Sequence, residues 1–362
     1  MNSCALVSRQ WCKFIIPILW SEPGNNFRDT RLIRTCLLTL NAEEQASLIP
    51  FDISLPSHQK PLFEHTSFIT SVNDYLSKGI KNWLSNPNLF SWLPYDHWFS
   101  YGELEHAVKC SLITMLLRTG KNLKYFYLDE IICNPPMLEY FYKNTTITSV
   151  DFHLSYGIKE DFKSRAIDGL VNILYKNSTL TSLNFKYVQL GTKEMKILLV
   201  ALDKNTTINS LCFYYHGIRD EEEKIFFAKL LCKNTTLTYL NLRLNNLGSE
   251  GGKALANALC LNSTLTSLDL SYNNLGSEGG KALAVALCKN STLKDLNLGF
   301  NNFGAEGGKA LADALCMNST LTSLNLNSIE LGLEGGKALA IDLCTNSTLK
   351  DLKLARNNLE SE

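Results

Sequence analysis

Apolar residues recur with a fixed period along the C-terminal part of the chain. The clearest copy reads NSTLTSLDLSYNNLGSEGGKALAVALCK, and from it onward the copies repeat every 28 residues. Copies begin at Asn144, Asn177, Asn205, Asn234, Asn262, Asn290, Asn318 and Asn346. A period of this length predicts a solenoid, because one such unit cannot bury its own apolar face and needs its neighbours.

The pattern within each copy predicts one strand and one helix. Its leucines and one asparagine fit the spacing L-x-x-L-x-L-x-x-N-x-L, as in Leu265, Leu268, Leu270, Asn273 and Leu275. Leu268 and Leu270 alternate with polar residues, which predicts a short strand with both leucines on its buried face. Apolar residues of the segment 276–288 follow at helical spacing, which predicts a helix packed against the strand layer.

Residues 144–362, by this unit length and motif, resemble the ribonuclease-inhibitor-like leucine-rich-repeat family. The resemblance implies an α/β fold, a leucine-rich-repeat horseshoe with parallel strands inside and helices outside. It also implies that the motif asparagine bonds backbone groups of adjacent turns. Val188, His216 and Ile329 stand where other copies have this asparagine. Of the three, His216 alone carries a side chain that can form replacement hydrogen bonds.

The chain before these repeats divides into two further regions. Residues 96–143 predict an N-terminal capping region, with a degenerate repeat around Phe126 and a preceding helix near Glu103 to Arg118. Residues 1–95 show no repeat but contain several short amphipathic patterns at helical spacing. We therefore expect a small all-α segment in front of the repeat array.

A second motif is recognised by the spacing of residues at the start of the chain, SCALVSRQWCKFIIPILW. Residues 1–22 resemble the second half of an F-box, whose pattern is C-x-L-V-x-R-x-W followed by P-x-L-W. An F-box is a helical hook that packs on the adaptor of cullin-type ubiquitin ligases. The resemblance implies adaptor contacts by Leu6, Val7, Trp11, Pro17, Leu19 and Trp20. The alternative is that these side chains are only the core of the first helices.

Both ends of the pattern are incomplete. The first half of the F-box motif would precede Met1, and the last repeat stops at Glu362 after its strand and turn but before its helix. Terminal repeats normally carry a polar cap, which this last copy lacks. Such a pattern is expected of a fragment or of an imperfect gene model.

Outward side chains at the end of each predicted strand form columns along the array, with one member per repeat. Aromatic residues and arginine, which are enriched at binding hot spots, concentrate in the middle repeats. We call this set the ridge and expect it to bind a protein: Tyr187, Tyr214, Tyr215, Arg243, Leu244, Tyr272 and Phe300. The alternative is that these side chains only pack against one another along the strand ladder.

Charge and hydropathy exclude several classes of partner. Thirty-five basic residues balance thirty-five acidic ones, so the chain lacks the broad positive field that binds nucleic acid. The longest strongly apolar run, residues 14–20, contains Pro17 and is far shorter than the roughly 20 residues of a membrane helix. No secretory signal opens the chain. We therefore expect an intracellular protein, in the cytoplasm, the nucleus or both.

Cysteine and asparagine recur at places that suggest chemistry but have structural explanations. Five cysteines end the repeat helices, and we expect them to be buried as small hydrophobes: Cys232, Cys260, Cys288, Cys316 and Cys344. No CxxC pair or Cys/His cluster predicts a metal site. The Asn-Ser-Thr and Asn-Thr-Thr triplets match the glycosylation sequon. We expect these asparagines to be unmodified and to adopt the left-handed conformation at helix ends.

The recurrent GSEGGKA loop, as at Gly248 to Ala254, lacks the spacing and the hydroxyl residue of a phosphate-binding loop. We expect its glycines to permit a tight turn and close helix packing, with Ser249 or Ser277 as helix cap. No Ser/His/Asp, Cys/His or paired-carboxylate constellation stands out, and the six histidines are scattered. The sequence thus predicts no catalytic residue, no cofactor and no metal.

The pattern as a whole predicts a protein-interaction module rather than an enzyme. The first hypothesis is a substrate-recognition subunit of a cullin-type (SCF) ubiquitin ligase, with the adaptor at the N-terminal segment and the target on the repeats. The alternative is a leucine-rich-repeat scaffold or regulator with no ligase coupling, because these repeats also resemble those of Ran GTPase-activating proteins and intracellular immune receptors. GTPase activation itself is disfavoured, since the chain has no acidic tail.

Overall fold

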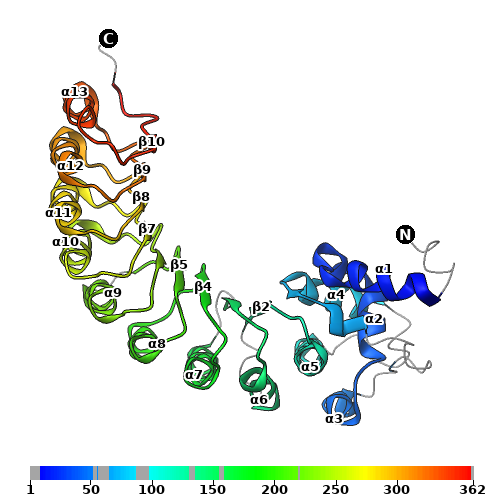
Figure 1. The fold of residues 1–362 in the computed structure, drawn as a ribbon. Coiled ribbons are helices and arrows are strands. Elements are labelled where there is room, and N and C mark those ends of the chain that lie inside the picture. The colour runs from blue at the N-terminus through cyan, green and yellow to red at the C-terminus, as the bar shows by residue number, and fades with distance from the viewer. Residues whose placement is uncertain are drawn as a thin grey trace. The chain divides into compact units, whose positions relative to one another are not determined.

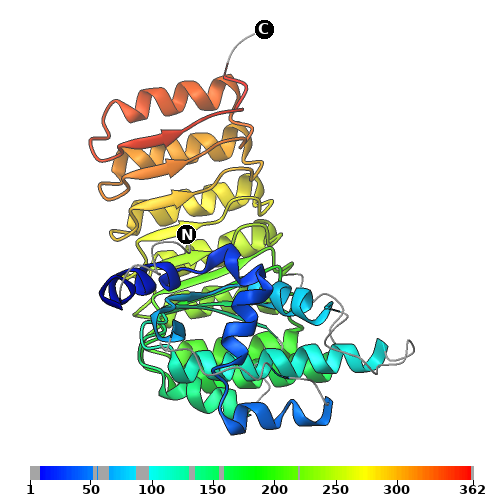
Figure 2. The ribbon, with the colours of Figure 1, turned by 90° about the vertical axis from the view of Figure 1, so that its right-hand side faces the viewer.

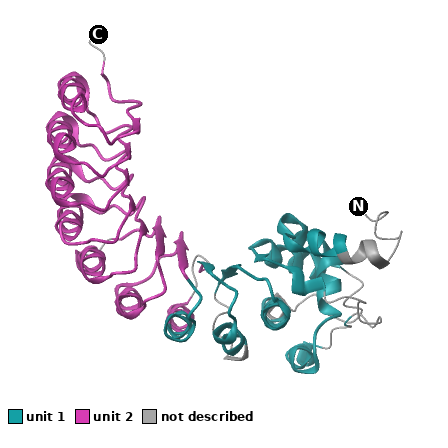
Figure 3. Ribbon diagram, viewed as in Figure 1, with its two compact units in different colours: residues 1–151, 168–180 teal, residues 152–167, 181–362 magenta. Residues whose placement is uncertain are grey.

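The structure, a computed structural model, describes residues 9–51, 55, 65–86, 98–129, 135–154, 159–218 and 221–359. It divides into two compact units (Figure 3). Unit 1 comprises residues 1–151 and 168–180, and unit 2 comprises residues 152–167 and 181–362. The boundary therefore passes through strand β3 (Ser149–Phe152) and helix α7 (Glu160–Lys176).

The described part of unit 1 contains helices of different lengths and the first three strands of the ladder. The helices are α1 (Arg9–Ser21), η1 (Gly24–Arg28), α2 (Thr30–Leu37), α3 (Ala42–Ala46), η2 (Ile49–Phe51), η3 (His65–Phe68), α4 (Tyr75–Leu84), α5 (Trp98–Thr119) and α6 (Pro135–Lys143). The strands follow in the order β1 (Ser71–Val72), β2 (Tyr125–Leu128) and β3. The helix expected near residues 103–118 is α5, and the degenerate repeat forms β2 and α6.

Strand β1 was not predicted from the sequence. It has only two residues, and it pairs in parallel with β2, so that Val72 lies opposite Phe126. The carbonyl oxygen of Thr70 accepts hydrogen bonds from the amides of Lys124 (2.8 Å) and Tyr125 (3.1 Å). The strand ladder thus begins inside the helical region, in a segment too short to show a period of two.

Gly79 lies where α4 passes against the backbone of η1, within unit 1. A Cβ atom at this position would lie 1.7 Å from the carbonyl oxygen of Phe27, whereas nothing lies within 4 Å of the corresponding point at Gly102 in α5. We expect Gly79→Ala to lower the free energy of unfolding by about 3 kcal/mol, because backbone must move apart. The matched Gly102→Ala should raise it by up to about 1 kcal/mol. Urea unfolding of both variants measures the difference, and equal stabilities would contradict this packing.

Unit 2 alternates strands with helices. The strands are β4 (Ser182–Lys186), β5 (Ser210–Tyr214), β6 (Tyr239–Asn241), β7 (Ser267–Asp269), β8 (Asp295–Asn297), β9 (Ser323–Asn325) and β10 (Asp351–Lys353). The helices are α8 (Thr192–Lys204), α9 (Glu221–Lys233), α10 (Gly248–Leu259), α11 (Gly276–Lys289), α12 (Gly304–Met317) and α13 (Gly332–Leu343). The strands are parallel, lie in sequence order and pair equivalent residues, such as Leu240 with Leu268.

Within unit 2 the array is curved, with the strands on the inner side and the helices on the outer side (Figures 1 and 2). The motif leucines form its core, since Leu268 and Leu270 are both buried. In the earlier repeats phenylalanines take the same layer, and the ring of Phe185 stacks on that of Phe213 at a centroid distance of 4.6 Å. The predicted fold class, parallel strands inside and helices outside, is confirmed.

The motif asparagine forms the ladder that the family resemblance implies. Asn273 Nδ2 donates to the carbonyl oxygens of Leu242 (2.8 Å) and Leu270 (2.9 Å), and Oδ1 accepts from the amide of Asn245 (3.0 Å). Equivalent bonds are made by Asn245, Asn301 and Asn357. Each side chain therefore joins its own turn to the turn of the repeat before it.

His216 replaces this asparagine in its repeat, but only in part. Its Nε2 accepts a long hydrogen bond of 3.4 Å from the amide of Leu190. Its Nδ1 is buried and has no hydrogen-bond partner among the described residues. Burial, and secondarily the positive charge of Lys163, lowers the pKa of His216 to about 3. The imidazole is therefore neutral in the folded protein at ordinary pH.

The depressed pKa of His216 predicts a loss of stability in acid. An unfolded histidine takes up a proton near pH 6.5, while the folded one does so only near pH 3. Stability that is complete above pH 6.5 is therefore lost as the pH falls toward 3. We expect about 2 kcal/mol to be lost between pH 7 and pH 5 through this residue. Urea unfolding should show a smaller loss in His216→Asn, and the same pH dependence in both proteins would contradict the assignment.

The sequon asparagines do not have the predicted left-handed backbone. Asn290 follows α11 in an extended conformation, with φ −79° and ψ 126°. Its role lies in the side chain, which is buried: Nδ2 donates to the carbonyl of Leu259 (2.8 Å), and Oδ1 accepts from the amide of Leu293 (2.8 Å). The amide nitrogen that glycosylation would modify is thus already bonded within the fold.

The repeat cysteines are not buried, so that prediction is wrong. Cys232, Cys288, Cys316 and Cys344 are exposed, and Cys260 is partly exposed. Each follows directly after the last core leucine of its helix. One residue is about 100° of helical rotation. The thiols therefore face away from the strand layer.

The glycine-rich loop behaves as expected in two respects and not in a third. Gly248 opens α10 with φ +65°, which a glycine adopts without strain. A Cβ atom on Gly252 would lie 3.2 Å from the Cα atom of Gly279, so the glycines permit close approach of α10 and α11. The serine cap does not form, because α10 begins at Gly248 with Leu247 before it and no side-chain cap bond.

Candidate protein-interaction site

The ridge lies in unit 2 at the carboxyl ends of strands β4 to β8. Tyr214 is the last residue of β5, and Tyr187 follows directly after β4. Backbone hydrogen bonds between neighbouring turns hold these positions in register, for example from the amide of Tyr187 to the carbonyl of Tyr214 (3.0 Å) and from that of Tyr272 to Gly299 (3.0 Å). Side chains that are one repeat apart in sequence are thereby placed next to each other.

Five ridge residues have the left-handed backbone conformation. Their φ angles are +60° at Tyr187, +54° at Tyr215, +61° at Leu244, +58° at Tyr272 and +60° at Phe300. This conformation costs a non-glycine residue roughly 1–2 kcal/mol and is uncommon for bulky side chains. The equivalent positions outside the ridge, Ser328 and Arg356, have the same conformation, so it belongs to the repeat turn, which fixes these side chains at the strand ends. Nothing in the sequence pattern indicated it.

The ridge side chains contact one another in a continuous row. The ring of Tyr187 meets those of Tyr214 and Tyr215, at centroid distances of 5.2 and 5.7 Å. The Arg243 guanidinium lies over the rings of Tyr272 (4.6 Å) and Tyr214 (5.9 Å). Tyr272 in turn stacks on Phe300 at 4.0 Å with nearly parallel rings.

Packing along the ladder, the alternative expected from the sequence, is therefore present. It does not remove the ridge from solvent, because Tyr187 and Tyr215 remain 58% and 51% exposed. Leu244, Tyr272 and Phe300 are each partly exposed. The residues thus form a preassembled apolar surface that a partner can reach.

Two polar groups of the ridge, the Tyr187 hydroxyl and the Arg243 guanidinium, carry hydrogen-bond donors. A hydrogen bond with the hydroxyl of Tyr214 raises the pKa of Tyr187, so this phenol stays protonated at neutral pH. Arg243 Nε is buried and lacks a hydrogen-bond partner among the residues that the structure describes. A buried donor without an acceptor costs about 1–3 kcal/mol. The site therefore combines aromatic faces with an unsatisfied cationic donor.

The residues expected to contact an adaptor are only partly described. Leu6 and Val7 lie outside the described residues, and Trp11 lies in α1. Pro17 is inside the same helix, and Leu19 is 39% exposed. The Trp20 ring packs on His65 at 4.8 Å.

Two further residues of α1 were not selected from the sequence. Phe14 and Ile18 are 71% and 73% exposed and stand one helical turn apart. Their spacing of four residues indicates that they lie on the same face of the helix. The F-box pattern drew attention to other positions, because Phe14 and Ile18 fall on its variable places.

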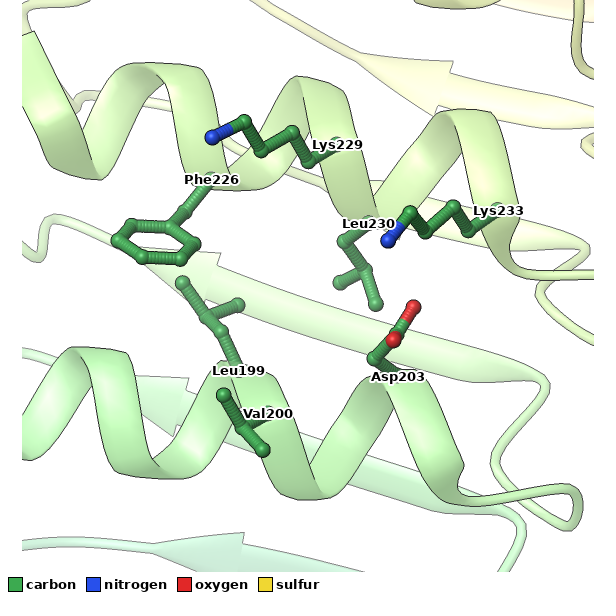
Figure 4. Close-up of a pocket in the computed structure, with 7 residues that line it drawn as sticks. All are labelled: Leu199, Val200, Asp203, Phe226, Lys229, Leu230 and Lys233. Atoms are coloured by element: carbon green, nitrogen blue, oxygen red, sulfur yellow. The ribbon is translucent and has the colours of Figure 1, made fainter.

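A separate pocket lies on the helical side of unit 2, between α8 and α9 (Figure 4). Its walls are apolar, while Asp203, Lys229 and Lys233 add charges of both signs. In Figure 4 the side chains of Lys233 and Asp203 point toward one another. The glycine pair that brings α10 close to α11 is absent from α8 and α9. This pocket has no contact with the ridge residues.

The described parts of the chain contain neither a metal site nor a membrane-spanning helix. No group of three or more His, Cys, Asp or Glu side chains there is placed to hold a metal ion. No described helix combines the length and the apolar character required to cross a membrane.

Comparison with known proteins identifies the repeats. None of the curated proteins matches the sequence significantly. Among solved structures, leiomodin-1 actin-binding site 2 is 22% identical, with a TM-score of 0.37, covering 41% of this chain and 86% of its own. The repeat protein LegL7 from Legionella pneumophila is 24% identical, with a TM-score of 0.47 and coverage of 70% and 80%. A chain of the yeast Rad7 and Elc1 complex is 17% identical, with a TM-score of 0.40 and coverage of 68% and 66%.

The family model described as Leucine Rich repeat matches four segments, residues 233–256, 261–284, 289–312 and 318–340. Each match covers a strand, the turn after it and most of the following helix, and the turn carries the motif asparagine in the first three matches. No family match corresponds to the F-box-like opening residues. The repeated strand and helix units from residue 233 to residue 340 are therefore leucine-rich repeats.

Proposed function

We propose that unit 2 binds a protein partner through the ridge. The observation that carries this proposal is the continuous row of partly exposed aromatic side chains around Arg243. Aromatic and arginine anchors supply most of the energy at protein interfaces. Here they are already held in place by the strand ladder, so little conformational entropy is lost on binding. The role proposed is binding and not catalysis.

Site-specific crosslinking tests this proposal in the full chain. A photoreactive benzophenone amino acid in place of Tyr215 should crosslink a defined protein in cells that produce the chain. The same amino acid in place of Tyr175, an exposed tyrosine on α7 outside the ridge, serves as the matched control. Identical crosslinked products from both positions would argue against the ridge as the binding site.

We further propose that the chain is a substrate-recognition subunit of a cullin-type ubiquitin ligase, with α1 contacting the adaptor. The support is the F-box-like spacing together with the exposed pair Phe14 and Ile18. A helix that presents apolar side chains at positions i and i+4 offers a face to a second protein. The ridge would then hold the target protein.

Capture of the full chain by the purified adaptor tests this finer proposal. Phe14→Ala with Ile18→Ala should reduce capture about ten-fold or more, because both apolar contacts are lost. Trp11→Ala with Leu6→Ala should act in the same direction. Ile49→Ala, which truncates an isoleucine of equal exposure elsewhere in unit 1, should have no effect.

A chain that the adaptor does not capture would reject the ligase proposal. The second candidate function would then apply, a leucine-rich-repeat scaffold or regulator with no ligase coupling. The four repeat matches support that role as well. Crosslinking from the ridge is expected under both functions, so the two experiments fail independently.

A further inference from the structure

We propose that the ridge recognises a carboxylate side chain, with Arg243 as the group that binds it and aromatic residues on both sides contacting apolar neighbours in the partner. The partner is thus a segment with an aspartate or glutamate flanked by apolar residues. This inference rests on the proposed protein-binding function and names the chemistry of its ligand.

Two aromatic rings hold the Arg243 guanidinium in position. Its guanidinium lies between the rings of Tyr214 and Tyr272, which belong to the repeats on either side. Two rings restrict its orientation, so the planar fork of N–H groups is oriented before a ligand arrives. Such a fork matches the two oxygens of a carboxylate.

The guanidinium of Arg243 is not paired with a carboxylate of the described residues. Arg243 Nε is buried, and no described residue accepts its hydrogen bond. Asp269, the acidic residue of the neighbouring strand β7, is occupied elsewhere. Its Oδ1 accepts from the amide and hydroxyl of Ser271, and its Oδ2 accepts from Asn297 Nδ2. No described carboxylate therefore holds the guanidinium, and because Arg243 is itself partly exposed, an acidic side chain of a partner can approach its other N–H groups.

Charge at this edge of unit 2 also favours an anion. The hydrogen bond with Tyr214 raises the pKa of Tyr187, but the charges of Lys186 and Arg243 both act to lower it. Both cations therefore contribute positive potential at the exposed tyrosines. A negatively charged partner is attracted to this part of the ridge.

The number of cations distinguishes a carboxylate from a phosphate. Sites for phosphorylated peptides use clusters of arginines, because the ligand carries up to two charges and three oxygens. Arg243 is the one arginine of the ridge, and the other cation near the ridge tyrosines, Lys186, is a lysine without the fork of N–H groups. A single oriented guanidinium fits a singly charged carboxylate.

The flanking rings define the rest of the segment. Tyr187 and Tyr215 lie on one side of Arg243, and the stacked pair Tyr272 and Phe300 lies on the other. These rings present apolar faces in successive repeats, so an extended segment can lay side chains on both. The expected ligand therefore has apolar residues before and after its acidic residue.

Selection of short random peptides on the full chain tests the inference. Selected peptides should carry aspartate or glutamate between apolar residues. Arg243→Gln should weaken binding of a synthetic copy of such a peptide at least about ten-fold. Replacing the acidic residue of the peptide by its amide should weaken binding to the original chain by a similar factor. Arg243→Lys keeps the charge but not the fork and should also bind more weakly. Arg356→Gln, in the last described repeat and outside the ridge, is the matched control and should bind normally.

The outcomes separate this inference from the proposed function. Peptides that lose affinity with Tyr215→Asn and Tyr272→Asn but not with Arg243→Gln would overturn the carboxylate and leave the ridge as the binding site. If no ridge substitution changes the affinity of the selected peptides, both the ridge as binding site and the carboxylate proposal are overturned. If no ridge-dependent peptide is selected at all, the carboxylate proposal is overturned. A phosphoserine peptide that binds more than about ten-fold tighter than its glutamate form would replace the carboxylate by a phosphate.

Discussion

Replacing Tyr215 or Tyr272 with asparagine is expected to weaken binding of the crosslinked partner about 30-fold in each variant. Each substitution removes an aromatic anchor, and such anchors contribute about 2 kcal/mol each. Asparagine is chosen because both positions have a left-handed backbone, which asparagine tolerates better than most residues. Asn274, two positions after Tyr272, adopts the same conformation. Titration calorimetry with the purified partner measures the loss.

Stability measurements make this result specific to binding. Because asparagine relieves backbone strain, the free energy of unfolding of both variants should stay within about 1 kcal/mol of the original value. Tyr175→Ala, which removes an equally exposed tyrosine from α7, should leave the affinity unchanged. If both ridge variants bind as tightly as the original chain, the rings serve only to pack along the ladder.

Asn273→Ala is expected to lower the free energy of unfolding by about 4 kcal/mol. The side chain is fully buried and bonds three carbonyl oxygens and two amide groups from two successive repeats. Each backbone group left without a partner costs about 1–3 kcal/mol, and water entering the cavity recovers part of the sum. Chemical denaturation followed by circular dichroism measures the change.

The matched control for this prediction is Asn257→Ala. Asn257 is exposed on α10, so removal of its side chain should change stability by no more than about 0.5 kcal/mol. An Asn273 variant as stable as the Asn257 variant would show that the ladder contributes little.

The repeat array was the most predictable part of the fold. Leu268 and Leu270 are buried in the strand layer, as the pattern predicts, and Asn273 bonds the preceding turn, as the family resemblance implies. Side-chain alternation and helical spacing are local properties, so the sequence records them directly. The buried cysteines and the serine caps were wrong, because both depend on where each helix starts and how it is rotated against the strands.

The candidate site was predictable in membership but not in geometry. Columns along a strand ladder follow from the repeat period, which is why Tyr187 and Phe300 were placed in one row. The ring contacts around Arg243 and the positive φ angles arise from the geometry of the turns. A tyrosine rarely adopts a positive φ angle, so the residue types gave no sign of this conformation. The exposure of Phe14 and Ile18 depends on which face of α1 packs against η3.

The sequence by itself determined the repeat, its strand and helix and the buried leucines, because a periodic chain can bury its apolar face only by stacking in register. The asparagine ladder was implied by the family resemblance. The tertiary structure alone decided that the ridge side chains touch, that they stay partly exposed, and that no described residue accepts a hydrogen bond from the buried Nε of Arg243. These properties depend on distances between residues of different repeats. Such distances are set by turn conformation and packing, which no local pattern of residues specifies.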